Sequence, residues 1–158
     1  MRRCVLLLVI AIHASCETTG GDASRATPST TSSRPSDVRD TELASVVKFE
    51  NEAVGFAGLP SRGAVAFAAI YNSPDAEDRF RDLLDHGTPA ARLYALTGLR
   101  AFDPIEFDRA AAKLCTRTDP VSTMRGCTGV DLPFGELVTQ IDDGAWDSLV
   151  EFAKSNRR

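Results

Sequence analysis

Four prolines, each directly preceded by a residue that can cap a helix, recur at nearly constant spacing. The pairs are Ser73-Pro74, Thr88-Pro89, Asp103-Pro104 and Asp119-Pro120, separated by 15, 15 and 16 residues. Ser, Thr and Asp side chains accept hydrogen bonds from the free amides of a first helical turn. Proline is favoured as the first helical residue, because its missing N–H would be unpaired there. The spacing predicts a stack of short helices joined by tight turns.

The N-terminus has the features of an export signal. Arg2 and Arg3 precede an apolar run over 5–12, which is too short to span a membrane and suits a removable signal. The following His13-Ala14-Ser15-Cys16 resembles the lipobox of bacterial lipoproteins, in which small residues precede a cysteine that becomes lipidated; His13 stands where an aliphatic residue is usual. We expect a signal peptide over 1–15 and lipidation of Cys16. Ordinary cleavage with secretion, or a retained segment, are the alternatives.

Residues 16–36 are expected to form the lipidated cysteine and a disordered tether. The run after Cys16 is rich in Ser, Thr, Gly and Pro and has no aliphatic side chain larger than alanine, so it cannot bury enough surface to fold. An acylated Cys16 would carry more than one lipid chain, and about two give stable attachment. The predicted location is the bacterial cell envelope, with the membrane bound through the N-terminal lipid.

Composition limits the functional classes of the remaining domain, which we expect over 37–158. The net charge of the chain is −4, with mixed-sign charges, whereas nucleic-acid-binding domains usually show a clustered basic face. The 43% hydrophobic content excludes wholesale disorder. After the signal, no stretch approaches the ~20 apolar residues that a membrane span needs. We therefore expect one folded domain that does not bind nucleic acid.

Hydrophobic periodicity predicts a chain of helices in this domain. They are expected over 37–50, 63–71, 74–86, 89–102 and 104–114, with two more carrying the stripes Phe134–Ile141 and Trp146–Ala153. The segment 53–62 fits either a frayed helix or a short strand. The stretch between the 104–114 helix and Phe134 is expected to be a loop.

One of these helices resembles a known repeat. The run Pro89-Ala-Ala-Arg92-Leu-Tyr-Ala95-Leu-Thr-Gly98-Leu99 is similar to the second helix of a HEAT repeat, although Gly98 stands where alanine is commoner. The resemblance implies an all-α fold, a short α-solenoid of antiparallel helices. It also implies protein binding along a curved helical surface, and neither an enzyme nor a cofactor.

Two cysteines, Cys115 and Cys127, remain in the mature chain once Cys16 is lipidated. In an exported protein, an even pair at short separation predicts a disulfide, worth about 3 kcal/mol on the loop-entropy account. Two unpaired thiols are the alternative. A metal or redox site is disfavoured, because further ligands and a C-x-x-C spacing are missing.

Four further residues are interpreted as structural. Arg92 is expected to bond the neighbouring turn or an acidic residue such as Asp85, and less favourably to hold an anion at a helix N-terminus. Tyr94 and Trp146 are expected in the core rather than on a binding platform. His86 is expected to complement the dipole at a helix C-terminus.

The case for catalysis is weak. Asp75, Glu77 and Asp78, and the pair Asp142-Asp143, are expected at helix starts, where acidic residues stabilise the first turn. No nucleotide-binding loop or metal motif is present in the sequence. The sequence thus predicts a membrane-tethered envelope lipoprotein with a helical protein-interaction domain. This domain would act as a scaffold, or as an inhibitor that masks a toxin or enzyme in the way of an immunity protein. The alternative is a small envelope hydrolase that works through carboxylates; self-assembly is a third possibility.

Overall fold

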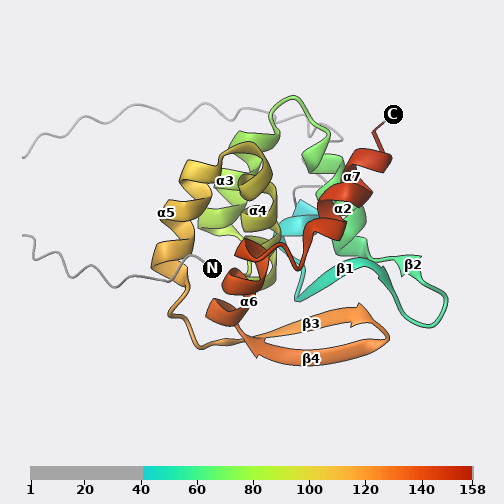
Figure 1. Ribbon diagram of the computed structural model, residues 1–158. Coiled ribbons are helices and arrows are strands. Elements are labelled where there is room, and N and C mark those ends of the chain that lie inside the picture. The colour runs from blue at the N-terminus through green and yellow to red at the C-terminus, as the bar shows by residue number, and fades with distance from the viewer. Residues whose placement is uncertain (1–40, 158) are drawn as a thin grey trace, which may run out of the picture. The chain divides into compact units, whose positions relative to one another are not determined.

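The computed structural model describes residues 41–157, in which two pairs of strands are each followed by a run of helices (Figure 1). After a short helical segment at 41–44, the elements are β1 (Lys48–Val54), β2 (Leu59–Pro60), α2 (Arg62–Tyr71), α3 (Ala76–His86), α4 (Pro89–Phe102), α5 (Pro104–Leu114), β3 (Pro120–Gly126), β4 (Thr128–Pro133), α6 (Phe134–Asp142) and α7 (Asp147–Ser155). Within this range, no helix is long and apolar enough to cross a membrane.

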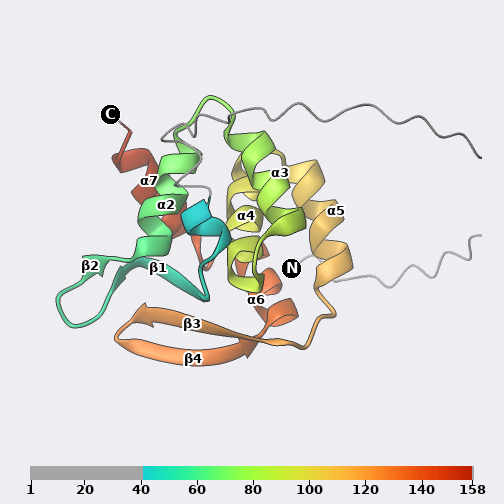
Figure 2. The ribbon, with the colours of Figure 1, turned by 180° about the vertical axis from the view of Figure 1, so that it is seen from behind.

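The predicted all-α solenoid is wrong. Within 41–157 the chain forms a four-stranded mixed sheet in the order β2-β1-β3-β4, and helices pack against it. β1 runs parallel to β3, while the β1–β2 and β3–β4 pairs are antiparallel. The fold is therefore α/β, and its helices pack on a sheet as well as on one another (Figures 1 and 2).

Two of the four proline pairs cap helices as predicted. The Thr88 hydroxyl accepts a hydrogen bond from the Ala91 amide at the start of α4, and the Asp103 carboxylate accepts one from the Glu106 amide at the start of α5. At the first pair, α3 begins two residues after Pro74, and the Ser73 hydroxyl donates to the Ile70 carbonyl instead.

The fourth pair does not begin a helix. Pro120 is the first residue of β3, a place where a strand tolerates proline. The Asp119 carboxylate accepts two hydrogen bonds from the Arg117 guanidinium, at 2.8 and 2.7 Å, and these hold the pKa of Asp119 below its usual value. Its side chain thus pairs with an arginine rather than with the amides of a helical turn.

The predicted first helix, 37–50, is also wrong in its second half. Of the described residues only 41–44 are helical there, and β1 begins at Lys48. The ambiguous segment 53–62 contains the end of β1, a turn, β2 and the start of α2. The Phe49 ring is fully buried in the core. Its centroid lies 4.8 Å from that of Tyr94 and 4.0 Å from that of Trp146, two residues from distant parts of the chain. These tertiary contacts favour the strand at this place over the predicted helix.

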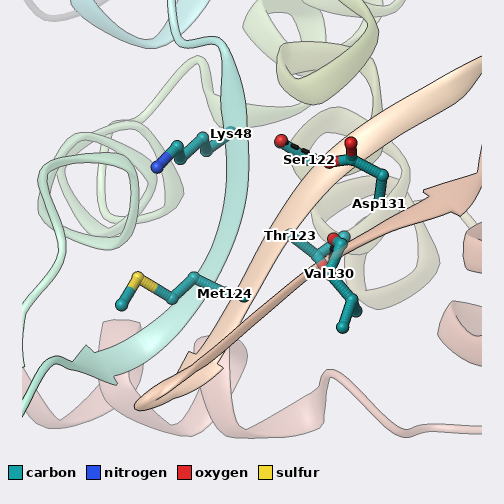
Figure 3. Close-up of a pocket in the computed structure, with 7 residues that line it drawn as sticks. Lys48, Ser122, Thr123, Met124, Val130 and Asp131 are labelled. Atoms are coloured by element: carbon teal, nitrogen blue, oxygen red, sulfur yellow. Dashed lines mark hydrogen bonds between the residues drawn. The ribbon is translucent and has the colours of Figure 1, made fainter.

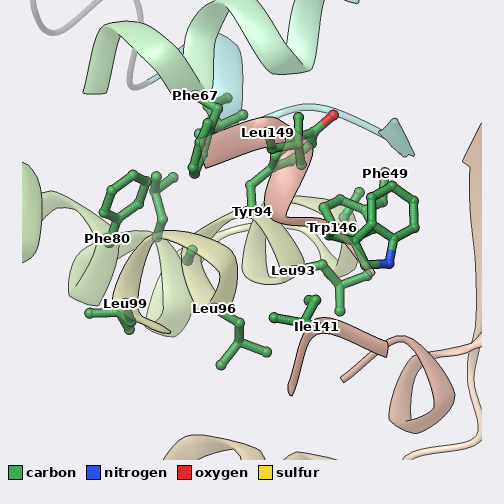
Figure 4. Packing of buried hydrophobic residues seen from close by; sticks show 14 of the residues in the cluster. Phe49, Phe67, Phe80, Leu93, Tyr94, Leu96, Leu99, Ile141, Trp146 and Leu149 are labelled. Atoms are coloured by element: carbon green, nitrogen blue, oxygen red, sulfur yellow. The ribbon is translucent and has the colours of Figure 1, made fainter. Parts of the chain in front are cut away.

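The core is centred on α4, which is buried over most of its length (Figure 4). Gly98 lies directly under Phe80 of α3: a Cβ atom added to Gly98 would fall 2.4 Å from the Phe80 ring. The glycine therefore permits the close approach of α3 and α4. On the other side of α4, the Phe49–Tyr94–Trp146 cluster joins it to the sheet.

Among residues 41–157, helices cover one face of the sheet and leave the other open. Phe49, Val121 and Thr123 are buried on the face that packs against the helices. Their neighbours along the strands, Lys48 and Ser122 among them, are exposed or half-buried, since successive side chains of a strand point to opposite faces. The open face and the β4 edge form the candidate site.

Candidate functional site

The register of the three central strands brings a polar row together on the open face. Lys48 of β1 lies opposite Ser122 of β3, which in turn lies opposite Asp131 of β4. The Ser122 hydroxyl donates a hydrogen bond of 2.5 Å to a carboxylate oxygen of Asp131 (Figure 3). The row therefore presents an ammonium group, and beside it a hydroxyl–carboxylate pair, from residues up to 83 positions apart in the sequence (131 − 48).

A shallow hollow of about 320 Å³ lies along this row. Besides the row it is lined by Thr123, Met124, Gly129 and Val130. Gly129 lies opposite Met124 and contributes no side chain, so the hollow is open there; a Cβ atom at Gly129 would meet nothing closer than the Thr123 carbonyl oxygen, at 3.6 Å. In Figure 3, Lys48 and Met124 extend to the same side of the sheet.

The outer edge of β4 has no strand beside it in the described part of the chain. β3 and β4 are joined by the two-residue turn Gly126-Cys127, in which Gly126 has a φ of 57°, as a type II′ turn requires. Because a turn bonds its first carbonyl to its fourth amide, Arg125 and Thr128 form a hydrogen-bonded pair. The alternation of an antiparallel ladder then directs the backbone groups of Gly129 and Asp131 away from β3.

This arrangement offers backbone hydrogen-bonding groups, opposite charges and a largely polar hollow whose apolar side chains are Met124 and Val130. Of the residues that the structure describes, Asp131 is the one carboxylate that lines the hollow, and no histidine lines it. Among residues 41–157, no group of three or more His, Cys, Asp or Glu side chains is placed to hold a metal ion. The surface suits recognition of an extended chain, because β-strand addition uses a free edge for affinity and side-chain pockets for specificity.

No protein family, curated protein or solved structure matches this chain. The lipobox-like and HEAT-like patterns therefore stay predictions from the residues alone.

Arg92 lies outside this surface and bonds the neighbouring turn, as expected. Its guanidinium donates to the carbonyl oxygens of Gly87, at 3.0 Å, and Asp85, at 2.9 Å. These bonds fix the α3–α4 turn through the backbone of Asp85 rather than through its carboxylate. Arg92 thus satisfies carbonyls at the C-terminal end of α3.

The aromatic residues and the histidine lie where the structural interpretation places them. Tyr94 and Trp146 are buried in the core. His86 is in the last turn of α3, exposed, and its Nδ1 atom lies 3.0 Å from a carboxylate oxygen of Asp82. None of the three lines the hollow.

The predicted Cys115–Cys127 disulfide is absent from the structure. Cys127 is an exposed free thiol in the β3–β4 turn, whereas Cys115 caps the end of α5 and its carbonyl lies against Gly135, beside the other end of the hairpin. The seven residues of β3 extend roughly 20 Å, and a disulfide needs Cα atoms within about 7 Å. The stretch between the cysteines was expected to be a loop, and a loop can fold back and bring Cys127 next to Cys115. A seven-residue strand holds them apart.

The acidic residues divide into two groups. Glu77 and Asp78 lie in the first turn of α3 as expected, and both bond Arg81. Asp142 and Asp143, by contrast, lie at the end of α6, not at a helix start. Neither group lines the hollow. The expected lipid site, Cys16, and the segments 1–15 and 17–36 lie outside the described residues.

None of the residues that form this surface was predicted from the sequence. A signal was present: the run Val121-Ser-Thr-Met-Arg-Gly-Cys-Thr-Gly-Val130 contains β-branched residues on both sides of a two-residue turn that begins with glycine, which is a hairpin pattern. The spacing of the proline pairs instead favoured a helix start at Asp119-Pro120, and the stretch up to Phe134 was expected to be a loop.

Proposed function

We propose that this protein is a lipid-anchored envelope protein whose folded domain binds an extended segment of a partner protein along the β4 edge. The lipobox-like sequence at Cys16 and the Ser/Thr-rich run after it support the membrane anchor. The open edge of β4, beside the hollow, is the observation that carries the binding activity.

The two edges of the sheet differ in how they are protected. β2 is two residues long and contains Pro60, which has no amide to offer. β4 has six residues, all exposed except Leu132; it carries one charged side chain and no lysine, and its one proline, Pro133, is its last residue and leaves the amides of Gly129 and Asp131 available. Natural sheets usually protect such an edge with lysine, proline or a bulge, because an unprotected edge pairs with other chains. β4 is therefore the edge at which a partner strand would add.

The hollow next to β4 supplies side-chain selectivity. A strand that paired with Gly129 and Asp131 would place one of its side chains beside Gly129, where no β4 side chain stands in its way. That side chain would lean toward Met124, so we expect an apolar residue there. The neighbouring Asp131, whose carboxylate is exposed, favours a cationic side chain two positions along the partner.

The experiment uses a photo-crosslinking residue in the full chain, expressed in a bacterial host and crosslinked in intact cells. Position Val130, on β4, is compared with Ile105, which is 74% exposed in the first turn of α5, at the opposite end of that helix from the one that leads to β3 and β4. We expect a protein crosslinked from Val130 and not from Ile105, through an extended segment identified by mass spectrometry. Equal crosslinking from both positions would contradict the proposal.

A second variant tests the edge itself. Asp131→Pro removes an amide that faces away from β3, so the hairpin keeps its ladder while the partner loses one hydrogen bond. We expect the crosslink from Val130 to weaken, whereas Asp131→Asn, which keeps the amide, retains most of it. A circular dichroism spectrum that is unchanged in both variants excludes unfolding as the cause.

A further inference from the structure

The turn between β1 and β2 carries the most exposed apolar side chain of the described chain. Phe56 is 103% exposed relative to a reference residue, and Leu59, three positions later, is 65% exposed. Both belong to the run Val54-Gly-Phe-Ala-Gly-Leu-Pro60. Figures 1 and 2 show this turn extending beyond the end of the sheet. Apolar side chains exposed next to one another mark contact surfaces more often than single exposed residues do.

The turn is held in a fixed shape rather than trailing as a loose loop. Gly55 and Gly58 have φ values of 72° and 59°, which only glycine adopts without strain. The Gly58 amide donates to the Gly55 carbonyl at 3.2 Å, and the Gly55 amide donates to the Gly126 carbonyl of the neighbouring hairpin at 2.9 Å. These bonds fix the turn and leave the Phe56 ring pointing away from the protein.

The turn itself carries no charged side chain, and the first charged residue after it is a cation. The span 53–61 contains no charged residue, and the next residue, Arg62, is exposed at the start of α2. The preceding Glu52 is half-buried, with one carboxylate oxygen shielded from solvent. An apolar projection flanked by an exposed arginine matches a membrane interface, where apolar groups enter the acyl region and cations meet anionic headgroups.

We infer that the β1–β2 turn inserts Phe56 and Leu59 into the surface of a lipid bilayer. The inference goes beyond the binding activity proposed for β4, because it concerns the opposite edge of the sheet and a lipid partner. A fluid bilayer accepts a narrow projection, whereas a protein partner would need a matching pocket. If the tether predicted over 17–36 is a flexible coil, its average span would be roughly 22–27 Å, so an anchor at Cys16 would keep the turn within reach of the same membrane.

The single tryptophan of the chain makes the turn accessible to fluorescence. Trp146 is 1% exposed and reports the core, so Phe56→Trp adds a reporter of the turn itself. The full chain, purified from bacterial membranes, is incorporated into vesicles of phosphatidylcholine and phosphatidylglycerol. Ile105→Trp, at the exposed start of α5, is the matched control, because the same anchor holds it near the same vesicle.

We expect the emission of Phe56→Trp to shift to shorter wavelength with vesicles, and lipids brominated in their acyl chains to quench it severalfold more than Ile105→Trp. Adding Leu59→Ser to Phe56→Trp should reduce both effects. Equal emission and quenching at the two positions would overturn the inference, as would a blue shift that grows with protein concentration without lipid, which would indicate contact between copies of the chain. The difference between Phe56→Trp and Ile105→Trp is informative whether or not Cys16 is acylated. It should also be unaffected by the β4 variants at Asp131, so this test and the test of the proposed function can fail separately.

Discussion

The Tyr94 hydroxyl is bonded to both backbone groups of Glu50. It accepts a hydrogen bond from the Glu50 amide and donates one to the Glu50 carbonyl, each at 2.9 Å. This pair of bonds ties the middle of α4 to β1 across 44 residues of sequence. The ring of Tyr94 also meets Phe49 edge-on, with 4.8 Å between ring centroids. One side chain thus joins the helical part of the core to the sheet.

Removing this hydroxyl should destabilise the protein. Tyr94→Phe leaves the amide and carbonyl of Glu50 without that partner in a half-buried place, which costs about 1–3 kcal/mol. The measurement is the free energy of unfolding from urea denaturation at neutral pH. Tyr71→Phe is the control, because Tyr71 is also buried but its hydroxyl makes no hydrogen bond to the described residues. A Tyr94→Phe variant as stable as this control would contradict the role assigned to the bonds.

Tyr94 should also make the protein sensitive to alkali. Burial raises the pKa of Tyr94 well above its usual value near 10. The folded state therefore keeps a proton that the unfolded state loses, so this contribution to stability is complete below about pH 10 and falls as pH rises further. We expect the stability difference between wild type and Tyr94→Phe to shrink between roughly pH 10 and 12. A difference that stays constant over this range would show that the buried phenol is not linked to folding.

Asp103 should contribute to stability at neutral pH and lose that contribution in acid. The Glu106 amide and the Arg81 guanidinium, the latter at 2.9 Å, hold the pKa of Asp103 below its usual value. The contribution is therefore present above the unfolded pKa of about 3.9 and is lost as pH falls through the lower folded value. We expect wild type to lose more stability than Asp103→Asn between about pH 5 and 2. Parallel losses in the two proteins would assign the acid sensitivity to other groups.

Gly98→Ala should destabilise the protein although alanine favours helix. The added Cβ would fall within 2.6 Å of three atoms of the Phe80 ring, and overpacking of this kind costs about 1–3 kcal/mol. The gain from helix propensity is roughly 1 kcal/mol. Gly129→Ala is the matched control, because its Cβ would meet only an ordinary contact at 3.6 Å. Thermal denaturation of both variants gives the comparison; a Gly98→Ala protein more stable than wild type would show that the α3–α4 interface is loosely packed.

The Cys127 thiol should react in the native protein. It is exposed and free in the β3–β4 turn, so a maleimide should modify it without denaturant, in the absence of reductant. Cys127→Ser should change stability by less than about 0.5 kcal/mol, whereas loss of a disulfide over this spacing would cost about 3 kcal/mol. Intact mass measurement scores the modification. If Cys127 reacts only after reduction, it is held in a disulfide, and the predicted bond would have to be reinstated.

The helices were predictable because their signals are local. Thr88 and Asp103 each cap the helix that their proline begins, and a cap acts on amides within three residues. The strands were not predicted, because β1 pairs with β3 some seventy positions away in the sequence. Neither strand has an energetic reason to be extended until the other is present. The same two-residue motif, Ser/Thr/Asp before proline, thus began a helix at Pro89 and Pro104 and a strand at Pro120.

The candidate site follows the same division. Arg92 and Tyr94 were selected from a helical pattern, and both are structural: one bonds the α3–α4 turn and the other bonds β1. The hollow is formed by side chains that share no local pattern, since Lys48 belongs to a stretch assigned to a helix and Asp131 to one assigned to a loop. Only the strand register places them in one row.

The sequence by itself determined the helices from α2 to α7 and the structural roles of Arg92, Tyr94 and Trp146. Caps, turn glycines and apolar stripes act within one or two helical turns, so the residues that specify them lie next to one another. Only the tertiary structure decided the sheet, the open β4 edge, the free thiol of Cys127 and the exposed Phe56 turn. These features depend on pairing between segments distant along the chain, and its hydrogen bonds form only after the fold has brought those segments together.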